Sequence, residues 1–228
     1  MKKLQTWVTL RGLVHLGAWL PLAWLAWAWW SDAVFFTANL TVNPIQAATK
    51  FTGKTAIILL TLSLACTPLN TVFGFRQPLS VRRALGLYAF LYAALHFTIF
   101  AGVDFGFNWT FLQPEITEKP YIIVGLTAGL ILLALAATSF RWWMKRLGRN
   151  WTRLHRLVYL AGLLVVLHYA WALKGDLFRL QGDVLQPLLF AGLVGLLLAL
   201  RLPPLRRWAS GLRARWRVRS PQGAGNRL

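Results

Sequence analysis

Charged side chains are scarce in this sequence, and acidic ones are scarcer still. Charged residues occupy 14% of the 228 positions, whereas a soluble domain carries about 25%. Hydrophobic residues make up 57%, and only six Asp and Glu accompany 25 Lys and Arg, for a formal net charge of +19. This composition excludes an ordinary soluble domain and predicts an integral membrane protein with a large excess of positive charge.

Cysteine is almost absent as well. The single Cys66 lies in an apolar run, which excludes an internal disulfide, a Cys-rich zinc site and an iron–sulfur cluster held by this chain. Zinc usually takes three or four ligands at short spacing, and the sequence has neither a His-x-x-x-His pair nor a carboxylate cluster. The apolar runs contain no Asp or Glu, which a proton relay would use. No soluble domain, long linker or internal repeat is apparent.

Six apolar runs, each close to the roughly 20 residues that cross a bilayer core, predict the fold class. We expect an all-α integral membrane protein, a six-transmembrane-helix bundle with cytoplasmic N- and C-termini. The first run is longer than the apolar part of a signal peptide and has no small-residue cleavage site, so it is interpreted as a membrane helix. The expected spans are about 10–30, 54–72, 83–103, 120–140, 153–173 and 184–201, in a domain of 10–201 flanked by a cytoplasmic N-terminus 1–9 and a basic cytoplasmic tail 202–228.

The positive charge follows this topology. With the N-terminus inside, 20 of the 25 Lys and Arg fall on inner segments, and all six acidic residues fall on outer ones. Positive residues favour the cytoplasmic side of membrane proteins, so the chain is predicted to be a multi-pass membrane protein with its basic segments in the cytoplasm. The net charge then reflects topology and attraction to anionic membrane lipid rather than nucleic-acid binding.

The segment 150–173 organises the chain, because it carries His155 near its start and His168 near its end. The four histidines lie on the first, third and fifth predicted spans, which run in the same direction. His96 and His168 each lie about 20 Å along their helices, and their equal depth predicts the two axial ligands of one haem iron, so the metal expected is haem iron. The alternative is that each histidine only hydrogen-bonds a neighbouring helix.

The other two histidines, His15 and His155, match in depth near the inner boundary. They are either a second haem site or haem contact, or side chains that face headgroups or water. At about 100° per residue, His155 and His168 point about 140° apart on an ideal helix. The inner histidine therefore meets a different helix from the outer one, or contacts haem edges rather than iron.

Several short motifs together resemble the MsrQ (YedZ) family within the ferric-reductase-like transmembrane group. They cover about 10–201, and they are Arg82-Arg83-x-Leu-Gly-Leu, Tyr92-x-x-Leu-His96, Pro120-Tyr121-x-x-x-Gly125, Thr138-Ser139, Trp151-x-x-Leu-His155-x-x-x-Tyr159 and His168-Tyr169. The resemblance implies haem b, one or two per chain, held between the third and fifth helices. It also implies electron transport across the inner membrane to a periplasmic molybdopterin reductase subunit, MsrP, which reduces methionine sulfoxide in oxidised proteins. The implied electron source is the quinone pool or a flavin reductase, and FMN is an implied further cofactor that would make the chain a flavoprotein.

Arginines stand where the resemblance would lead us to expect a histidine. Two-haem members of the wider group carry a second histidine before the one on the third helix, and here that region holds Arg82 and Arg83. These arginines either pair with haem propionates or only anchor the inner boundary. After Arg201 we expect only the basic tail, without a nicotinamide-binding element.

No set of residues suggests local bond chemistry, so no catalytic residue is expected. We therefore expect an electron-transfer subunit of an oxidoreductase complex rather than its catalytic subunit. The alternatives are a stand-alone ferric or quinone reductase of the same fold and a non-redox membrane scaffold.

The charge distribution predicts the sidedness of two loops. Reporter fusions at Gly148 should report the cytoplasm, and fusions at Gly106 should report the periplasm. The opposite result at both positions would reverse the orientation and the direction of electron flow.

Overall fold

The computed structural model describes residues 2–173, 184–205, 207 and 211. Within these residues every regular element is helical, which confirms the all-α expectation. The elements are α1 (Lys2–Phe35), α2 (Pro44–Phe73), α3 (Gln77–Thr98), the π-helical η1 (Ile99–Asp104), α4 (Trp109–Glu118), α5 (Pro120–Ala137), α6 (Arg141–Leu147), α7 (Arg149–His155), α8 (Leu157–Ala172) and α9 (Leu185–Ala199). The expected outer loop after α8, and most of the basic tail, lie outside the described residues.

Four helical stretches are long and apolar enough to cross a membrane: Pro44–Phe73, Gln77–Asp104, Pro120–Ala137 and Arg149–Ala172. The other two expected spans also fall on helices. However, α1 is not among the four, and α9 is apolar but has only 15 residues. The protein is therefore a membrane protein with several apolar helices, while the count of six spans stays a prediction.

Local sequence explains where the long helices begin and end. Asn43 caps α2 by accepting a hydrogen bond from the N–H of Gln46, and Pro44 occupies the first turn, where no N–H is needed. Gly74 ends α2 in the left-handed conformation that glycine adopts without steric cost. Lys119 precedes α5, which begins at Pro120.

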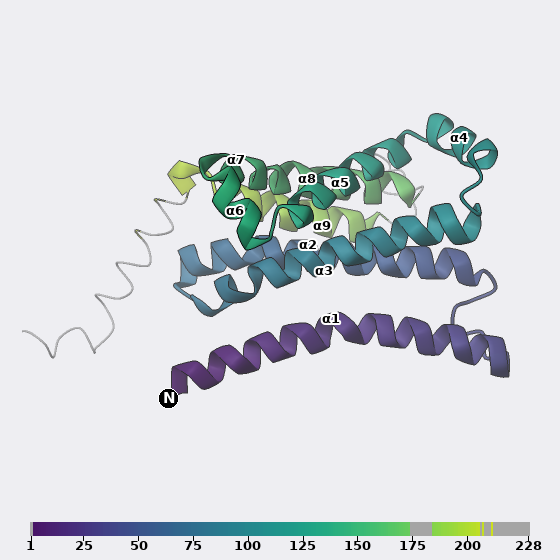
Figure 1. Cartoon of the computed structure of the whole chain (residues 1–228), viewed down its shortest axis with the longest axis horizontal. Helices are drawn as coiled ribbons and strands as arrows, with labels where there is room; N and C mark the ends of the chain where they lie inside the picture. Colours follow the sequence, from purple (N-terminus) through teal and green to yellow (C-terminus); the bar gives the residue numbers. More distant parts are fainter. Residues whose placement is uncertain (1, 174–183, 206, 208–210, 212–228) are drawn as a thin grey trace, which may run out of the picture.

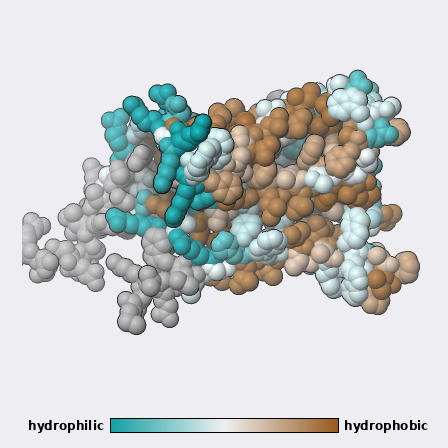
Figure 2. Space-filling model, in the orientation of Figure 1, coloured by the Kyte–Doolittle hydropathy of each residue, from teal (hydrophilic) through white to brown (hydrophobic). Residues whose placement is uncertain are grey.

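The helices run alongside one another, with the short elements at the two ends (Figure 1). The most extensive contacts join α2 to α3 and α5 to α8. The start of α1 lies at the same end of the molecule as α6 and α7, and α4 lies at the opposite end (Figure 1). Figure 2 shows hydrophilic side chains gathered at the α6–α7 end and an apolar surface along most of the remaining length. This distribution suits a bundle surrounded by lipid with one basic end.

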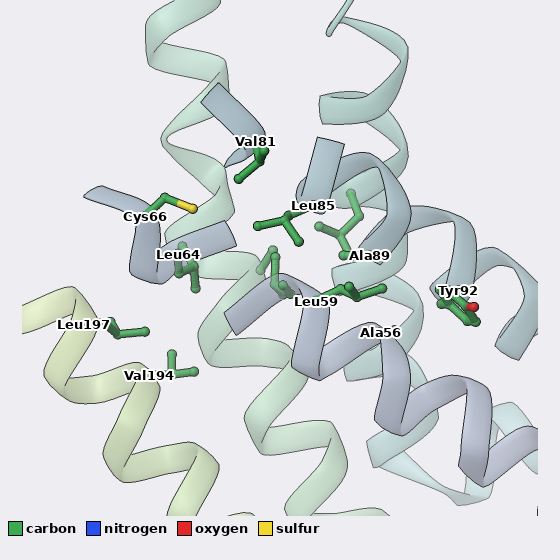
Figure 3. Close-up of a cluster of buried hydrophobic side chains, with 13 residues drawn as sticks. Ala56, Leu59, Leu64, Cys66, Val81, Leu85, Ala89, Tyr92, Val194 and Leu197 are labelled. Atoms are coloured by element: carbon green, nitrogen blue, oxygen red, sulfur yellow. The ribbon is translucent and has the colours of Figure 1, made fainter. Parts of the chain in front are cut away.

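The main core joins α2 and α3 to α5, α8 and α9. Figure 3 shows apolar side chains of α2, such as Leu59 and Leu64, facing Leu85 and Ala89 of α3, with Val194 of α9 alongside. Cys66 is buried in this cluster with a free thiol, as expected for a small core residue.

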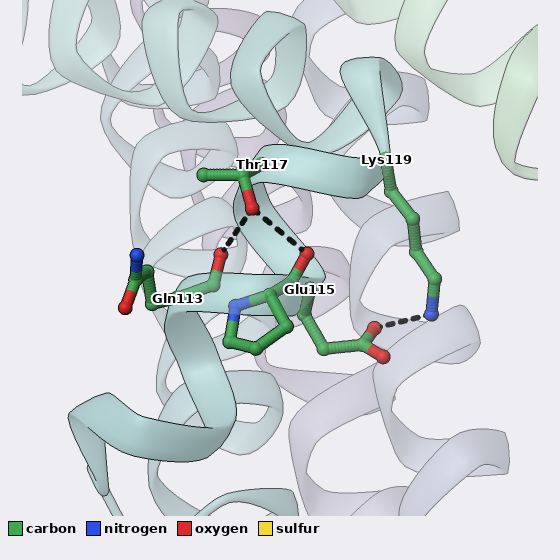
Figure 4. Close-up of polar contacts among 5 residues, drawn as sticks. Gln113, Glu115, Thr117 and Lys119 are labelled. Carbon is green, nitrogen blue, oxygen red and sulfur yellow. Dashed lines mark hydrogen bonds and ion pairs between the residues drawn. The ribbon is translucent and has the colours of Figure 1, made fainter.

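Side-chain contacts lie at the C-terminal end of α4, just before α5 begins. The Thr117 hydroxyl donates to the carbonyls of Gln113 and Pro114, and Lys119 forms an ion pair with Glu115 (Figure 4). The hydrogen bond from Lys119 to Glu115 is the main cause that raises the pKa of the lysine.

Tyr92 ties α3 to α1 and generates a stability prediction. Its side chain is fully buried, and its hydroxyl donates to the carbonyl of Ala18 over 2.6 Å. Tyr92→Phe should lower the free energy of unfolding by about 1 kcal/mol, because the hydrogen bond is lost inside the bundle. The matched control is Tyr88→Phe, whose hydroxyl bonds the exposed His15. Thermal unfolding in detergent measures both, and equal midpoints for Tyr92→Phe and wild type would contradict the prediction.

Candidate functional site

The structure brings His96 of α3 and His168 of α8 together. Their ring centroids are 6.0 Å apart, and the ring planes lie 82° from each other. The two residues are 72 positions apart in the sequence, and they meet because α3 and α8 belong to helix pairs that pack in one bundle. The matched depth expected from the sequence thus corresponds to a direct juxtaposition.

A backbone carbonyl holds each ring. Nδ1 of His96 lies 2.8 Å from the carbonyl oxygen of Thr49 on α2, and Nδ1 of His168 lies 2.7 Å from that of Tyr121 on α5. A carbonyl can only accept, so Nδ1 of each neutral ring carries the proton and Nε2 carries the lone pair. Within the described part of the chain, neither Nε2 has a hydrogen-bond partner. Each Nε2 lone pair could therefore bind a metal.

This contact recurs with identical spacing, which sequence inspection missed. Each hydrogen bond spans 47 residues. When the sequence is aligned with itself at an offset of 72 positions, the His96 segment aligns with the His168 segment, and residues of α2 align with residues of α5. Identical pairs under this shift include Gly53 and Gly125, Thr55 and Thr127, Ala56 and Ala128, Ala89 and Ala161, and Leu95 and Leu167. The α2–α3 and α5–α8 pairs thus present their histidines in the same way.

Two facing imidazoles suit a metal held from two opposite sides. Two metal–nitrogen bonds of about 2 Å, one on each side of the metal, would set the ring centroids roughly 6 Å apart. Among the described residues there is no group of three or more His, Cys, Asp or Glu that could bind a metal ion. A pair without further protein ligands fits an iron whose remaining four positions belong to a macrocycle.

The structure does not bring His15 and His155 together. His15 Nδ1 lies 2.8 Å from the Tyr88 hydroxyl in an exposed contact between α1 and α3. His155 Nε2 lies 3.2 Å from the Thr138 hydroxyl, and the Trp151 ring stacks on it at a centroid distance of 4.1 Å. Each inner histidine thus engages partners of its own.

The expected span 153–173 falls on the helical stretch Arg149–Ala172, which tightens locally at one position. Helix α7 ends at His155, and α8 begins at Leu157. The N–H of Arg156 bonds the carbonyl of Arg153, three residues back, in a tighter turn than the α-helix uses. The 140° separation expected for His155 and His168 was counted on an ideal helix, from which this single turn departs.

Arginines of two segments, α3 and the residues just after α9, gather at the basic end of the bundle. Arg82 donates to the Thr67 hydroxyl over 3.1 Å, and both Arg82 and Arg83 interact electrostatically with His155. Arg201 donates to the Tyr159 hydroxyl over 2.9 Å and to the Leu64 carbonyl over 2.6 Å. Sequence reasoning counted Arg201 only as an inner charge and missed these contacts, because no local motif links it to residues so distant in the chain.

Comparisons with known proteins agree with this geometry. A family model described as ferric reductase like transmembrane component matches residues 52–166. A protein of Rhodospirillum rubrum is 43% identical over 200 residues, which cover 87% of this chain and 90% of the relative. A protein of Xanthomonas campestris pv. campestris strain 8004 is 40% identical over 201 residues, which cover 88% and 89%. Both relatives are named protein-methionine-sulfoxide reductase heme-binding subunit MsrQ.

The chain belongs to the MsrQ family. This assignment confirms the resemblance drawn from the motifs. The residues matched by the ferric-reductase-like model include His96 and His155 and end two positions before His168. In this MsrQ-family chain the structure shows that His168, just beyond the matched residues, lies directly against His96.

Proposed function

We propose that this chain is the haem-binding subunit of a protein-methionine-sulfoxide reductase and that it holds one haem b between His96 and His168. The observation that carries the proposal is the pair of imidazoles 6.0 Å apart, each with Nδ1 bound to a carbonyl and Nε2 unpartnered in the described part of the chain. The names of the relatives, which call them heme-binding subunits, support it.

A bound haem supplies a one-electron carrier inside the membrane. The residues of this chain do the rest. His96 and His168 would hold the iron, and the carbonyls of Thr49 and Tyr121 fix which ring nitrogen carries the proton. Both imidazoles lie on helices of the apolar bundle. An apolar shell controls the access of water to such a site and so influences the redox potential of the group bound there.

The orientation of the chain is proposed from the charge distribution, and the direction of transfer from the resemblance to MsrQ. The basic end is proposed to face the cytoplasm of a bacterium, so that 10–201 spans the inner membrane and the tail 202–228 stays inside. His96 and His168 then lie in the outer half of the bilayer, near the periplasmic side. Electrons leave there for the periplasmic molybdopterin subunit, MsrP, which carries out the sulfoxide chemistry. The donor is the quinone pool or a flavin reductase, with FMN as an accompanying cofactor.

One haem rather than two is supported by the inner level of the bundle. Under the shift of 72 positions, His155 aligns with Arg83 instead of a second histidine. His15 bonds Tyr88, and His155 bonds Thr138. We therefore assign Arg82, Arg83 and His155 to contacts with anionic groups at the inner boundary, such as haem propionates or lipid headgroups.

The ligand assignment is tested by His96→Ala and His168→Ala. Each change should remove haem and abolish electron delivery to the reductase, because one axial bond and its imidazole are gone. The variants should still insert in the membrane. Haem per chain and the Soret spectrum of detergent-purified protein measure the effect, with His15→Ala as the control. A wild-type spectrum with intact electron transfer in either variant would rule the assignment out.

His155→Ala tests the number of haems. We expect haem content and the Soret band to stay close to wild type, since the imidazole contacts Thr138 and Trp151 rather than another histidine. A pyridine haemochrome assay of the purified variant gives the count. Loss of half the haem would instead establish a second haem ligated by His155.

A further inference from the structure

We propose that Gly53 and Gly125 are positioning residues for the two haem ligands. Each glycine lets an imidazole lie directly against a helix, so that Nδ1 reaches a backbone carbonyl of that helix and Nε2 points away from it. The inference rests on the proposed haem function and adds two residues to the site.

The space beside each glycine is filled by a histidine ring. A Cβ at Gly53 would lie 2.9 Å from Nδ1 and 3.1 Å from Cε1 of His96. A Cβ at Gly125 would lie 2.6 Å from Nδ1 and 2.7 Å from Cε1 of His168. These distances are shorter than non-bonded carbon and nitrogen atoms tolerate. A side chain at either position therefore forces the ring, the helix or both to move.

Helix geometry explains why the glycines stand at these positions. Thr49 precedes Gly53 by four residues, and Tyr121 precedes Gly125 by four. In an α-helix the carbonyl of one residue points toward the N–H of the residue four positions later. An imidazole that reaches this carbonyl from the side therefore lies over the later residue. Only glycine leaves that surface open.

The arrangement occurs twice, and this repetition argues against accident. Each glycine lies 43 positions before the histidine that it contacts, on the helix that packs most extensively against the histidine's own helix. Gly129, one turn after Gly125 on the same helix, has no atom within 4 Å of the position of its Cβ. Close approach is thus a property of Gly53 and Gly125 and is not shared by every glycine of α5.

Displacing a ring should change the redox potential of the haem, which a simple loss of packing should not. The Nδ1 hydrogen bond raises the basicity of a metal-bound imidazole and fixes its orientation. If the ring tilts away from the carbonyl, the bond lengthens and the ligand donates less charge to the iron. The midpoint potential of the haem should then become more positive, and the electron paramagnetic resonance spectrum should change with the angle between the ring planes.

The test compares Gly125→Ala and Gly53→Ala with the matched control Gly129→Ala in the purified full-length chain. Gly125→Ala should lower haem affinity on the order of tenfold, the range typical when a partner of a metal ligand is disturbed. It should also raise the midpoint potential. Gly53→Ala should produce the same changes to a smaller extent, because its closest contact is longer. Gly129→Ala should keep the wild-type haem content, spectrum and potential.

A double variant separates positioning from general destabilisation. Alanine has a higher helix propensity than glycine, so Gly125→Ala without the ring conflict should not unfold the helix. In the His168→Ala background, Gly125→Ala should therefore leave thermal stability unchanged or raise it, whereas in the wild-type background it should lower it. Equal effects in both backgrounds would show that the glycine acts independently of His168.

Each outcome separates this inference from the proposed function. Normal haem content, potential and resonance spectrum in both glycine variants, together with haem loss in His96→Ala and His168→Ala, would overturn the positioning role and leave the ligand assignment intact. Haem retention in the histidine variants would overturn the proposed function itself.

Discussion

An imidazole inside an apolar bundle must satisfy its ring N–H, because an unpaired polar group there is costly. In this protein the donors of His96 and His168 are both satisfied by backbone carbonyls of a partner helix, Thr49 on α2 and Tyr121 on α5. These two hydrogen bonds fix the proton on Nδ1 and leave Nε2 as the base. They also join the two helices within each of the pairs α2–α3 and α5–α8, which make the most extensive contacts in the fold. Ligand chemistry and helix packing therefore depend on the same contact.

The two levels of the bundle differ in a way that bears on electron transfer. At one level the α2–α3 and α5–α8 pairs present equivalent histidines, and the rings meet. At the other level, toward the basic end, the equivalent positions are Arg83 and His155. His155 contacts the Thr138 hydroxyl, and the neighbouring Arg82 donates to Thr67. The level of His96 and His168 has two equivalent imidazoles, which suit an iron between two ligands. The level of Arg83 and His155 has positive charge, which suits an anionic group. This division is consistent with one redox centre at the level of His96 and His168 and a positively charged boundary at the basic end.

Much of the fold and the histidine pair could be predicted from the sequence. Apolar runs indicated the helices, since bilayer thickness sets their length, and counting residues along parallel helices matched His96 with His168 in depth. Helix α1 illustrates a limit, because the structure makes it helical over Lys2–Phe35 but it is not among the stretches long and apolar enough to cross a membrane.

Contacts between distant residues could not be predicted. The approach of Gly53 to His96 and the reach of Arg201 to Leu64 depend on how helices pack, and no local pattern encodes them. The repeat between the two helix pairs was hidden because most aligned positions carry different apolar side chains, which serve equally well in a lipid-facing helix.

The most direct test of the central claim is the electron paramagnetic resonance spectrum of the oxidised wild-type protein, recorded together with haem per chain. Two axial imidazoles make a ferric haem low-spin, and ring planes near the observed 82° make its signal strongly anisotropic. We expect one haem b per chain with such a low-spin signal. A high-spin signal, or protein that binds no haem, would contradict ligation by both His96 and His168.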